Sequence, residues 1–334
     1  MRILAIQLKR LGDLVLTTGA LRSLRQAYPA AQVCLLIDEY AEELAPAIEG
    51  VDETWVYRRK RILGLWPRLV GASFDVCLDF TGTDRSALAT FLSKAPKRIG
   101  VRKRGQRPLR DWVYNASATS GVRDVHTVDL YLDVVRQLNG AAPPAEPSLR
   151  LPEAVITSAH GLVQELGVAD AYFTVHAGAA RPEKLWPPES WAEIIAEAHR
   201  FSGLPCLLTG GRDRAEVKQV RQIRAEIANR APCFVLAGRT DLLLTCAVIR
   251  KTKFFLGIDS VGAHLAALFQ RPALVLFGPT NPFHWRPRHA QARVVRAGFG
   301  PDYEPVSPVE KGRPMTQLST ETVIRAMEHL RGWI

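Results

Sequence analysis

Short apolar runs alternate with longer helical patterns along the whole of this 334-residue chain. The runs are rich in Val, Ile, Leu and Phe, which is typical of buried strands. Parallel strands need a crossing connection of about a dozen residues, and the helical segments between the runs supply it. The pattern therefore predicts an α/β fold with parallel sheets. We expect strands at residues 3–8, 33–37, 53–57, 74–79, 98–101, 172–176, 206–209, 234–236, 254–258 and 273–277.

A proline-rich break divides the chain, which is long enough for two domains. Residues 139–147 contain three prolines and cannot continue the amphipathic helix expected at residues 125–138. We therefore predict a first domain at residues 1–142, a linker at 143–152 and a second domain at 153–318. Residues 298–317 are loop-like, and Ser319 offers an N-cap for a last helix within residues 319–334. For its apolar stripe, packing back toward the first domain is one option.

The charge balance favours an anionic partner. The 44 Lys and Arg residues outnumber the 33 Asp and Glu residues, for a net charge of +11. Much of the excess in the first half lies in two basic clusters, residues 58–61 and 94–110. These clusters form either a solvated face or a surface for an anionic bilayer, where each cation contributes roughly 1 kcal/mol. No nucleic acid is expected, because no aromatic-rich RNA motif or helix-turn-helix pattern accompanies the charge.

Cysteine usage and the first residues favour the cytosol. The amino-terminal run leads directly to Lys9 and Arg10 and is no signal peptide. No stretch reaches the roughly 18 uninterrupted apolar residues of a spanning helix, so any membrane contact would be peripheral. No His, Cys and acidic cluster has metal-ligand spacing, so no metal is expected. The cysteines lack paired CxxC spacing and are predicted to be buried reduced thiols: Cys34, Cys77, Cys206, Cys233 and Cys246.

The segment after the strand at 254–258 has the composition of a phosphate site. Asp259, Ser260 and Gly262 suit a tight turn and a helix start, where unpaired backbone N–H groups attract phosphate. A second strand is followed by a Gly-Pro-Thr loop that begins at Gly278, and we expect this loop at the same edge of the sheet. Asp259 either binds a ribose or sugar hydroxyl or holds the loop. His264, inside the helix, is either a ligand contact or a buried hydrogen-bonded histidine.

Further strand ends in the second half carry small residues and cations. Residues 176–187 bring small side chains and then Arg181 and Lys184, which either neutralise a phosphate or lie on a solvated loop. Gly210 and Gly238 follow two more strands, where each either admits a ligand or serves a turn. The concentration of such residues favours a nucleotide site in the second domain.

In the first half, Asp13 is the first candidate for catalysis. The first strand is followed by Gly12 and Asp13, and we expect the helix to begin at Leu14. This is the turn where α/β proteins place ligands. The alternative is that Asp13 is the N-cap of the helix, and the two roles can coexist. The GxGxxG fingerprint is absent.

Four of these segments, in this order along nearly the whole chain, resemble the lipopolysaccharide heptosyltransferases of glycosyltransferase family 9: residues 9–13, 125–132, 181–187 and 257–282. The resemblance implies a GT-B fold, two facing Rossmann-like domains with a cleft between them. It implies inverting, metal-independent transfer of heptose from ADP-L-glycero-D-manno-heptose, without a further cofactor. The acceptor would be a lipid-linked acidic saccharide of the inner core that bears Kdo or heptose. The enzyme would be cytoplasmic, in peripheral contact with the anionic cytosolic face of the bacterial inner membrane.

The resemblance also implies roles for single residues. Asp13 matches the family's proposed general base, and Lys184 matches the lysine that contacts the donor phosphates. Val261 takes the place of a glycine found in many relatives, and Gly178 and Ala179 stand where some have threonines. Alternatives are another GT-B nucleotide-sugar enzyme, such as a UDP-sugar transferase or epimerase, and a non-catalytic protein that binds anionic ligands. The expected donor-binding residues are Gly12, Gly178, Ala179, Arg181, Lys184, Gly210, Gly238, Asp259, Ser260, Val261, Gly262, Ala263, His264, Gly278 and Thr280.

Overall fold

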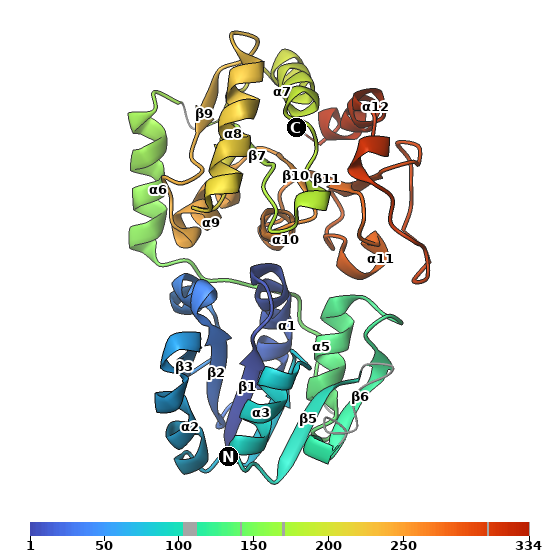
Figure 1. Ribbon diagram of the computed structural model, residues 1–334. Helices are drawn as coiled ribbons and strands as arrows, with labels where there is room; N and C mark the ends of the chain where they lie inside the picture. Colours follow the sequence, from blue (N-terminus) through green and yellow to red (C-terminus); the bar gives the residue numbers. More distant parts are fainter. Residues whose placement is uncertain (103–111, 141, 169–170, 306, 334) are drawn as a thin grey trace. The chain divides into compact units, whose positions relative to one another are not determined.

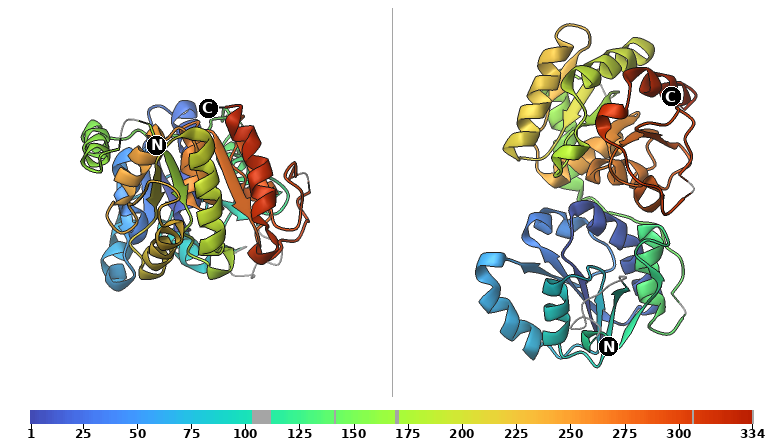
Figure 2. Two further views of the ribbon diagram at one scale, coloured as in Figure 1. Left: turned by 90° about the horizontal axis from the view of Figure 1, so that it is seen from above. Right: turned by 45° about the vertical axis from the view of Figure 1, so that its right-hand side comes forward.

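The chain folds into two compact units, Met1–Arg150 and Leu151–Ile334. The computed structural model describes residues 1–102, 112–140, 142–168, 171–305 and 307–333 (Figure 1). Each unit contains one six-stranded parallel sheet with helices packed on it (Figure 2). The predicted α/β class with parallel sheets is therefore confirmed.

The first sheet has the strand order β3-β2-β1-β4-β5-β6, and every pairing in it is parallel. Its strands are β1 (Arg2–Gln7), β2 (Gln32–Asp38), β3 (Glu53–Tyr57), β4 (Val76–Asp79), β5 (Lys97–Arg102) and β6 (Ala116–Gly121). The described helices are α1 (Leu11–Ala27), η1 (Glu39–Ala47), η2 (Arg59–Arg61), α2 (Ile62–Gly71), α3 (Asp84–Leu92) and α5 (Thr127–Arg136). Helix α1 packs beside α5, and α2 packs beside α3.

The second sheet has the order β12-β11-β10-β7-β8-β9. Its strands are β7 (Phe173–His176), β8 (Cys206–Thr209), β9 (Cys233–Val235), β10 (Phe255–Ile258), β11 (Ala273–Phe277) and β12 (Ala292–Arg296). The helices are α6 (Glu153–Glu165), η3 (Pro182–Lys184), α7 (Pro188–Ser202), α8 (Arg214–Ile227), α9 (Leu242–Lys251), α10 (Val261–Leu268), α11 (Pro282–Trp285), η4 (Met315–Gln317) and α12 (Thr320–Arg331).

The two sheets share one topology. In each, the strand order runs outward in one direction from the first strand and then reverses to the other side. The reversal lies between β1 and β4 in the first unit and between β7 and β10 in the second. Ligands of open α/β sheets bind outside the carboxyl ends of the strands at this point. The fold therefore marks one candidate position in each unit.

Two strands were not predicted, and both lie at sheet edges. Strand β6 reads Ala-Ser-Ala-Thr-Ser-Gly and carries no apolar run. Strand β12 has five residues and carries arginines at its second and last positions, Arg293 and Arg296. An edge strand is covered less completely than a central one, so its sequence is less constrained to be apolar.

The last helix packs on its own unit. Ser319 caps α12, as predicted, by accepting a hydrogen bond from the Thr322 N–H at 3.2 Å. The apolar face of α12, with Val323 and Met327, is buried in the core of the second unit against α7 and β12. The apolar stripe predicted for this helix is therefore buried within the second unit.

The segment before the boundary packs on α1. The Ser23 hydroxyl donates to the Pro143 carbonyl at 2.5 Å, and the Ser148 N–H donates to Thr18 Oγ1 at 3.0 Å. Gly19 permits this contact, since a Cβ there would lie 2.6 Å from the Ala145 carbonyl oxygen. These contacts place residues 142–150 with the first unit.

All five cysteines are buried free thiols, as predicted. Burial raises the pKa of the Cys77 thiol to about 12. Within the described part of the chain, no helix combines the length and apolar character needed to cross a membrane.

Candidate active site

The carboxylate of Asp13 lies at the reversal point of the first sheet. Helix α1 begins at Leu11, so Asp13 is inside its first turn, and Arg10 occupies the N-cap position without a side-chain cap bond. The expectation that the helix begins at Leu14, and the alternative that Asp13 is the N-cap, are wrong. Asp13 Oδ1 instead accepts a hydrogen bond from the Tyr131 hydroxyl at 2.6 Å.

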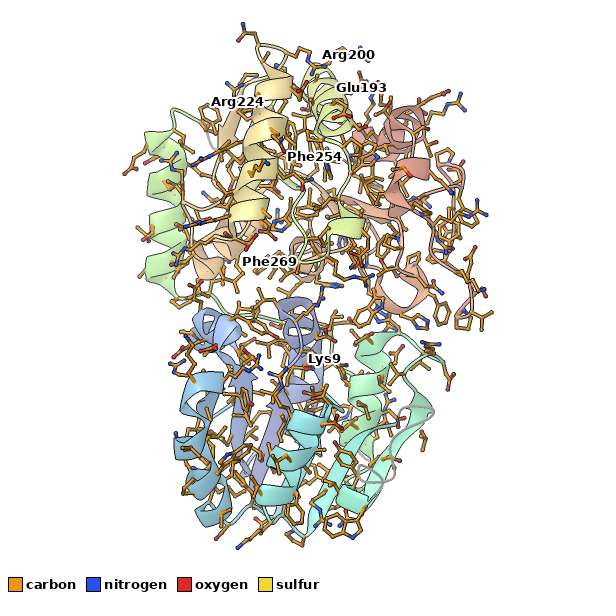
Figure 3. The ribbon with its side chains drawn as sticks, viewed as in Figure 1. Lys9, Glu193, Arg200, Arg224, Phe254 and Phe269 are labelled. Atoms are coloured by element: carbon orange, nitrogen blue, oxygen red, sulfur yellow. The ribbon has the colours of Figure 1, made fainter. Side chains whose placement is uncertain are left out.

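Two further groups hold Asp13, one at its carboxylate and one at its backbone carbonyl. The ammonium of Lys9, labelled in Figure 3, lies 3.7 Å from the same Asp13 Oδ1. The Thr17 hydroxyl donates to the Asp13 backbone carbonyl at 2.7 Å and accepts from Gln7 Nε2 at 2.7 Å. The other carboxylate oxygen, Oδ2, accepts no hydrogen bond from any described residue. Asp13 is only 8% exposed. Its Oδ1 is held by Tyr131 and Lys9, whereas its Oδ2 has no such partner among the described residues and is open to accept a proton.

Tyr131 is the residue that the sequence analysis missed. It is fully buried on α5 and packs edge-on against Phe80, with ring centroids 5.7 Å apart. Burial and the charge of Asp13 hold the pKa of its phenol well above the usual value, so it stays protonated and donates. In the sequence Tyr131 lies on an apolar helix face and looks like a core residue. Its hydroxyl was the available signal, because a buried tyrosine hydroxyl usually has a partner.

A second carboxylate at this edge has a structural role. Asp79, at the end of β4, is fully buried, and its Oδ1 accepts from the N–H groups of Thr81 and Gly82 at 2.7 and 3.1 Å. Its Oδ2 accepts from the Tyr114 hydroxyl at 2.6 Å. Thr81 Oγ1 in turn accepts from the Leu8 N–H at 2.8 Å, which ties the β4 loop to the end of β1. Both oxygens of Asp79 are therefore engaged.

In the second unit, three segments meet at Asp259. This residue follows β10, is 7% exposed, and its Oδ2 accepts from the Thr280 hydroxyl at 2.6 Å. The Lys184 ammonium donates to the same Oδ2 at 2.5 Å and to the Asp259 carbonyl at 3.0 Å. The reading of Lys184 as a solvated loop residue is wrong, since its side chain is only 14% exposed. Arg181, by contrast, pairs with Glu183 at 2.7 Å at the surface.

The start of α10 is the predicted phosphate platform. Ser260 occupies the N-cap position in an extended conformation but makes no side-chain cap bond. Its hydroxyl oxygen is buried and has no hydrogen-bond partner among the described residues. The first N–H groups of a helix have no partner within it, so they are available to an anion together with this hydroxyl. Val261 is the first residue of α10, and the buried residues Ala263 and His264 follow.

Helix α8 supplies an acid that sequence reasoning missed. Glu216 Oε2 accepts a hydrogen bond from the Gly211 N–H at 2.5 Å. Gly178 leaves room for it, because a Cβ there would lie 2.8 Å from the Glu216 carboxyl carbon. Nearby, His176 Nδ1 lies 3.1 Å from Thr209 Oγ1. Burial lowers the pKa of His176, against the opposing charge of Glu216. An acid in the first helical turn after a Gly-Gly loop was the signal for Glu216.

Comparison with known proteins decides the family. The family described as Glycosyltransferase family 9 (heptosyltransferase) matches residues 62–311, well over half of the chain. The chain belongs to glycosyltransferase family 9. It is therefore a transferase enzyme, and the predicted family resemblance is confirmed.

Relatives of this family 9 chain agree over most of its length. Lipopolysaccharide heptosyltransferase 3 of Escherichia coli is 25% identical over 288 residues, which are 83% of this chain and 82% of that protein. Two solved structures resemble the fold. A family 9 glycosyltransferase from Veillonella parvula has a TM-score of 0.85 at 24% identity, covering 99% of this chain and 97% of that one. The E. coli ADP-heptose lipopolysaccharide heptosyltransferase II has a TM-score of 0.79 at 22% identity, covering 99% and 98%. The predicted GT-B fold class is confirmed.

Several glycines predicted to contact the donor also have packing roles in this family 9 fold. A Cβ on Gly262 would lie 2.9 Å from His176 Cγ, and one on Gly278 would lie 2.5 Å from Met315 Sδ. Gly238 has a φ of +77° in a turn, where its N–H donates to the Gly211 carbonyl at 3.1 Å. The other predicted small residues lie as follows: Gly12 in the first turn of α1, Ala179 partly buried against the core, and Gly210 beside Ala237.

Proposed function

We propose that this family 9 enzyme transfers heptose from ADP-L-glycero-D-manno-heptose to a lipopolysaccharide inner-core acceptor that bears Kdo or heptose, with inversion at the anomeric carbon. The observation that carries the proposal is the Asp13 carboxylate, held through one oxygen and open at the other. The names of the relatives support the donor and the acceptor class, since they are lipopolysaccharide heptosyltransferases and one is described with ADP-heptose.

In the first unit, Asp13 is the general base. Its open oxygen, Oδ2, takes the proton from the acceptor hydroxyl while the hydroxyl oxygen forms its bond to the anomeric carbon. Tyr131 and Lys9 keep Oδ1 fixed, so the carboxylate does not have to reorganise as the proton moves. Attack from the face opposite the leaving group inverts the anomeric configuration.

In the second unit, the departing diphosphate receives the electron pair of the broken anomeric C–O bond. Lys184 has three N–H donors, and two of them are used on Asp259. The third is available to a phosphate oxygen. The N–H groups at the start of α10 and the unpartnered Ser260 hydroxyl add neutral donors. We propose that these groups stabilise the leaving group without a metal ion. Among the described residues, no group of three His, Cys, Asp or Glu is placed to hold a metal.

Membrane contact is part of the proposal, because the acceptor is lipid-linked. The rings of Phe91 on α3 and Trp112 lie in contact, tilted by 38° with centroids 5.3 Å apart, and the two residues are 46% and 68% exposed. Leu88, one turn away from Phe91, is 45% exposed, and Lys94 follows the helix at the surface. Exposed aromatic and basic side chains suit an anionic bilayer interface. We propose a cytoplasmic enzyme in peripheral contact with the inner membrane through this face.

The two basic clusters contribute to this proposal unequally. In the cluster at 58–61, Arg58 pairs with Glu42 through two hydrogen bonds of 2.7 Å, whereas Arg59 and Lys60 are exposed. Of the cluster at 94–110, residues 103–110 lie outside the described residues.

Binding of the full chain to vesicles with and without phosphatidylglycerol tests the membrane contact, with Phe91→Ser as the variant. Equal binding of the wild type to neutral and anionic vesicles would contradict it.

The function itself is tested by ADP release. Purified enzyme is incubated with ADP-heptose and a panel of Kdo-bearing lipid A precursors, and the product linkage is determined by NMR. We expect release that depends on both substrates, an inverted linkage, and no effect of EDTA. Preference for a UDP-sugar, or for UDP over ADP in binding, would overturn the donor assignment in favour of another GT-B activity.

A further inference from the structure

An open groove lies beside α8, and of the residues predicted to contact the donor its lining includes only Gly238. It encloses about 660 Å³ between α8 and the loop that follows β9. All of its lining lies within described residues and contains no acidic side chain. Its charged residues are all cations: Arg212, Arg214, Lys218, Arg221 and Arg239.

Helix periodicity explains why three cations share one side. Arg214, Lys218 and Arg221 are spaced four and three residues apart, so they form one stripe on α8. Glu216 is about 200° around the helix from Arg214, at about 100° per residue. It faces the strand ends, where it accepts the Gly211 N–H. The cations of the groove therefore lie on the side of α8 away from Glu216.

Most of these cations have no counter-ion. Among contacts between described residues, Arg214, Lys218, Arg221 and Arg239 form no side-chain hydrogen bond and no ion pair. By contrast, exposed Arg200 pairs with Glu197, and exposed Arg325 pairs with Glu321. Like charges four residues apart on a helix repel each other, so this stripe disfavours the helix unless an anion binds.

The floor of the groove is small and apolar. Gly238 has a φ of +77°, and a Cβ on it would lie 2.9 Å from Val217 Cγ2. With Ala225 and Ala237 also in the lining, nothing bulky fills the space between the cations. No aromatic side chain lines the groove, so it offers no platform for stacking bases.

We propose that this groove binds a compact ligand that carries two or more clustered phosphate groups, at a site separate from that of the donor. Arginine forks and a lysine ammonium around a small apolar floor match several phosphates within reach of one another. The phosphates belong either to a soluble polyphosphorylated molecule or to an anionic lipid headgroup. The proposal does not depend on the identity of the sugar that the enzyme transfers.

The test uses the full chain saturated with ADP and titrated with inorganic tripolyphosphate in a calorimeter. The variant is Lys218→Glu with Arg221→Glu. The control is Arg150→Glu with Lys253→Glu, which makes the same charge change at two exposed positions outside the groove. We expect the groove variant to bind tripolyphosphate at least about tenfold more weakly, and the control to bind like the wild type. ADP binding should be unchanged in both.

Three results would overturn the proposal. Loss of tripolyphosphate binding when ADP is present would show that the groove belongs to the donor site. An equal loss of tripolyphosphate affinity in the control variant would show that the effect comes from net charge alone. Tighter binding of single-stranded RNA than of tripolyphosphate would show that the groove binds nucleic acid instead. A vesicle arm with cardiolipin, whose headgroup carries two phosphates, identifies the source of the phosphates. Weaker vesicle binding of the groove variant alone indicates a lipid headgroup, and unchanged vesicle binding indicates a soluble ligand. The tripolyphosphate titration does not depend on turnover of ADP-heptose, so a failure of the proposed function would not change its outcome.

Discussion

The Tyr131 hydroxyl on α5 lies 2.6 Å from Oδ1 of Asp13 on α1, although the two residues are 118 positions apart in the sequence. The bond links two helices that pack side by side on one face of the first sheet. The neutral Tyr131 phenol donates a hydrogen bond to this carboxylate and brings no charge of its own. The pair therefore orients the proposed base through Oδ1 and leaves Oδ2 without a hydrogen bond from any described residue.

Replacement of the base tests the proposed chemistry most directly. Asp13→Asn keeps the size of the side chain and its ability to accept from Tyr131, but it cannot take up a proton at neutral pH. We expect kcat to fall by about 10² to 10⁴, which is the usual contribution of a positioned base. The affinity for ADP, measured by calorimetry, should be unchanged, because Asp13 is not in the unit with the phosphate platform. A variant that keeps more than about a third of the activity would contradict the assignment.

Tyr131→Phe separates positioning from catalysis. Phenylalanine retains the ring that packs against Phe80 but removes the hydrogen bond to Asp13. A buried carboxylate that loses a donor costs about 1–3 kcal/mol, so the free energy of unfolding in urea should fall by an amount in this range. We also expect a drop in kcat of about tenfold with an unchanged KM for the donor. A loss of stability with full kcat would assign Tyr131 a purely structural role.

The sequence predicted the central strands because each is a continuous buried apolar run. It also placed Asp259 at the carboxyl edge of the sheet, because this residue directly follows β10, and it placed Asp13 and Lys184 in the segments that follow β1 and β7. Tyr131 and Glu216 were missed because each belongs to a helix whose face toward the site is set only by packing. The glycines show a further limit. A glycine such as Gly178 indicates that space is needed, but only the structure shows that Glu216 comes within reach of that space.

Lys184 should affect both donor binding and stability. Lys184→Met removes the partner of a buried carboxylate, since Asp259 is 7% exposed, and breaking such a pair costs about 3 kcal/mol. It also removes the proposed phosphate contact, so we expect ADP to bind at least about tenfold more weakly. Thr280→Val is the matched comparison, because it removes the other side-chain donor to Asp259 Oδ2 but leaves the cation, and we expect it to weaken ADP binding less than Lys184→Met does. If both variants weaken ADP binding equally, Lys184 has no separate role at the phosphates.

The pH dependence of stability should show the burial of His176. Burial lowers its pKa in the folded state below the usual value of 6.5, so the unfolded chain binds the proton more readily. The favourable contribution is complete above the unfolded pKa and is lost as the pH falls through the folded pKa. We expect the free energy of unfolding to decrease below about pH 6.5, and to decrease less in His176→Asn. Identical slopes for the two proteins would show that other groups cause the decrease.

Two glycine substitutions should have opposite effects. Gly262→Ala places a Cβ 2.9 Å from His176 Cγ and 3.1 Å from Phe255 Cζ, in a core where neither ring has room to move. We expect a loss of about 1–3 kcal/mol of stability, together with weaker ADP binding, because the start of α10 must shift. Gly161→Ala, inside α6, meets no atom within 4 Å and should stabilise the protein by about 0.5–1 kcal/mol through helix propensity. Chemical denaturation of both variants measures the difference. If Gly262→Ala leaves both the free energy of unfolding and the ADP affinity unchanged, α10 tolerates displacement. The phosphate platform at its start would then not be rigid.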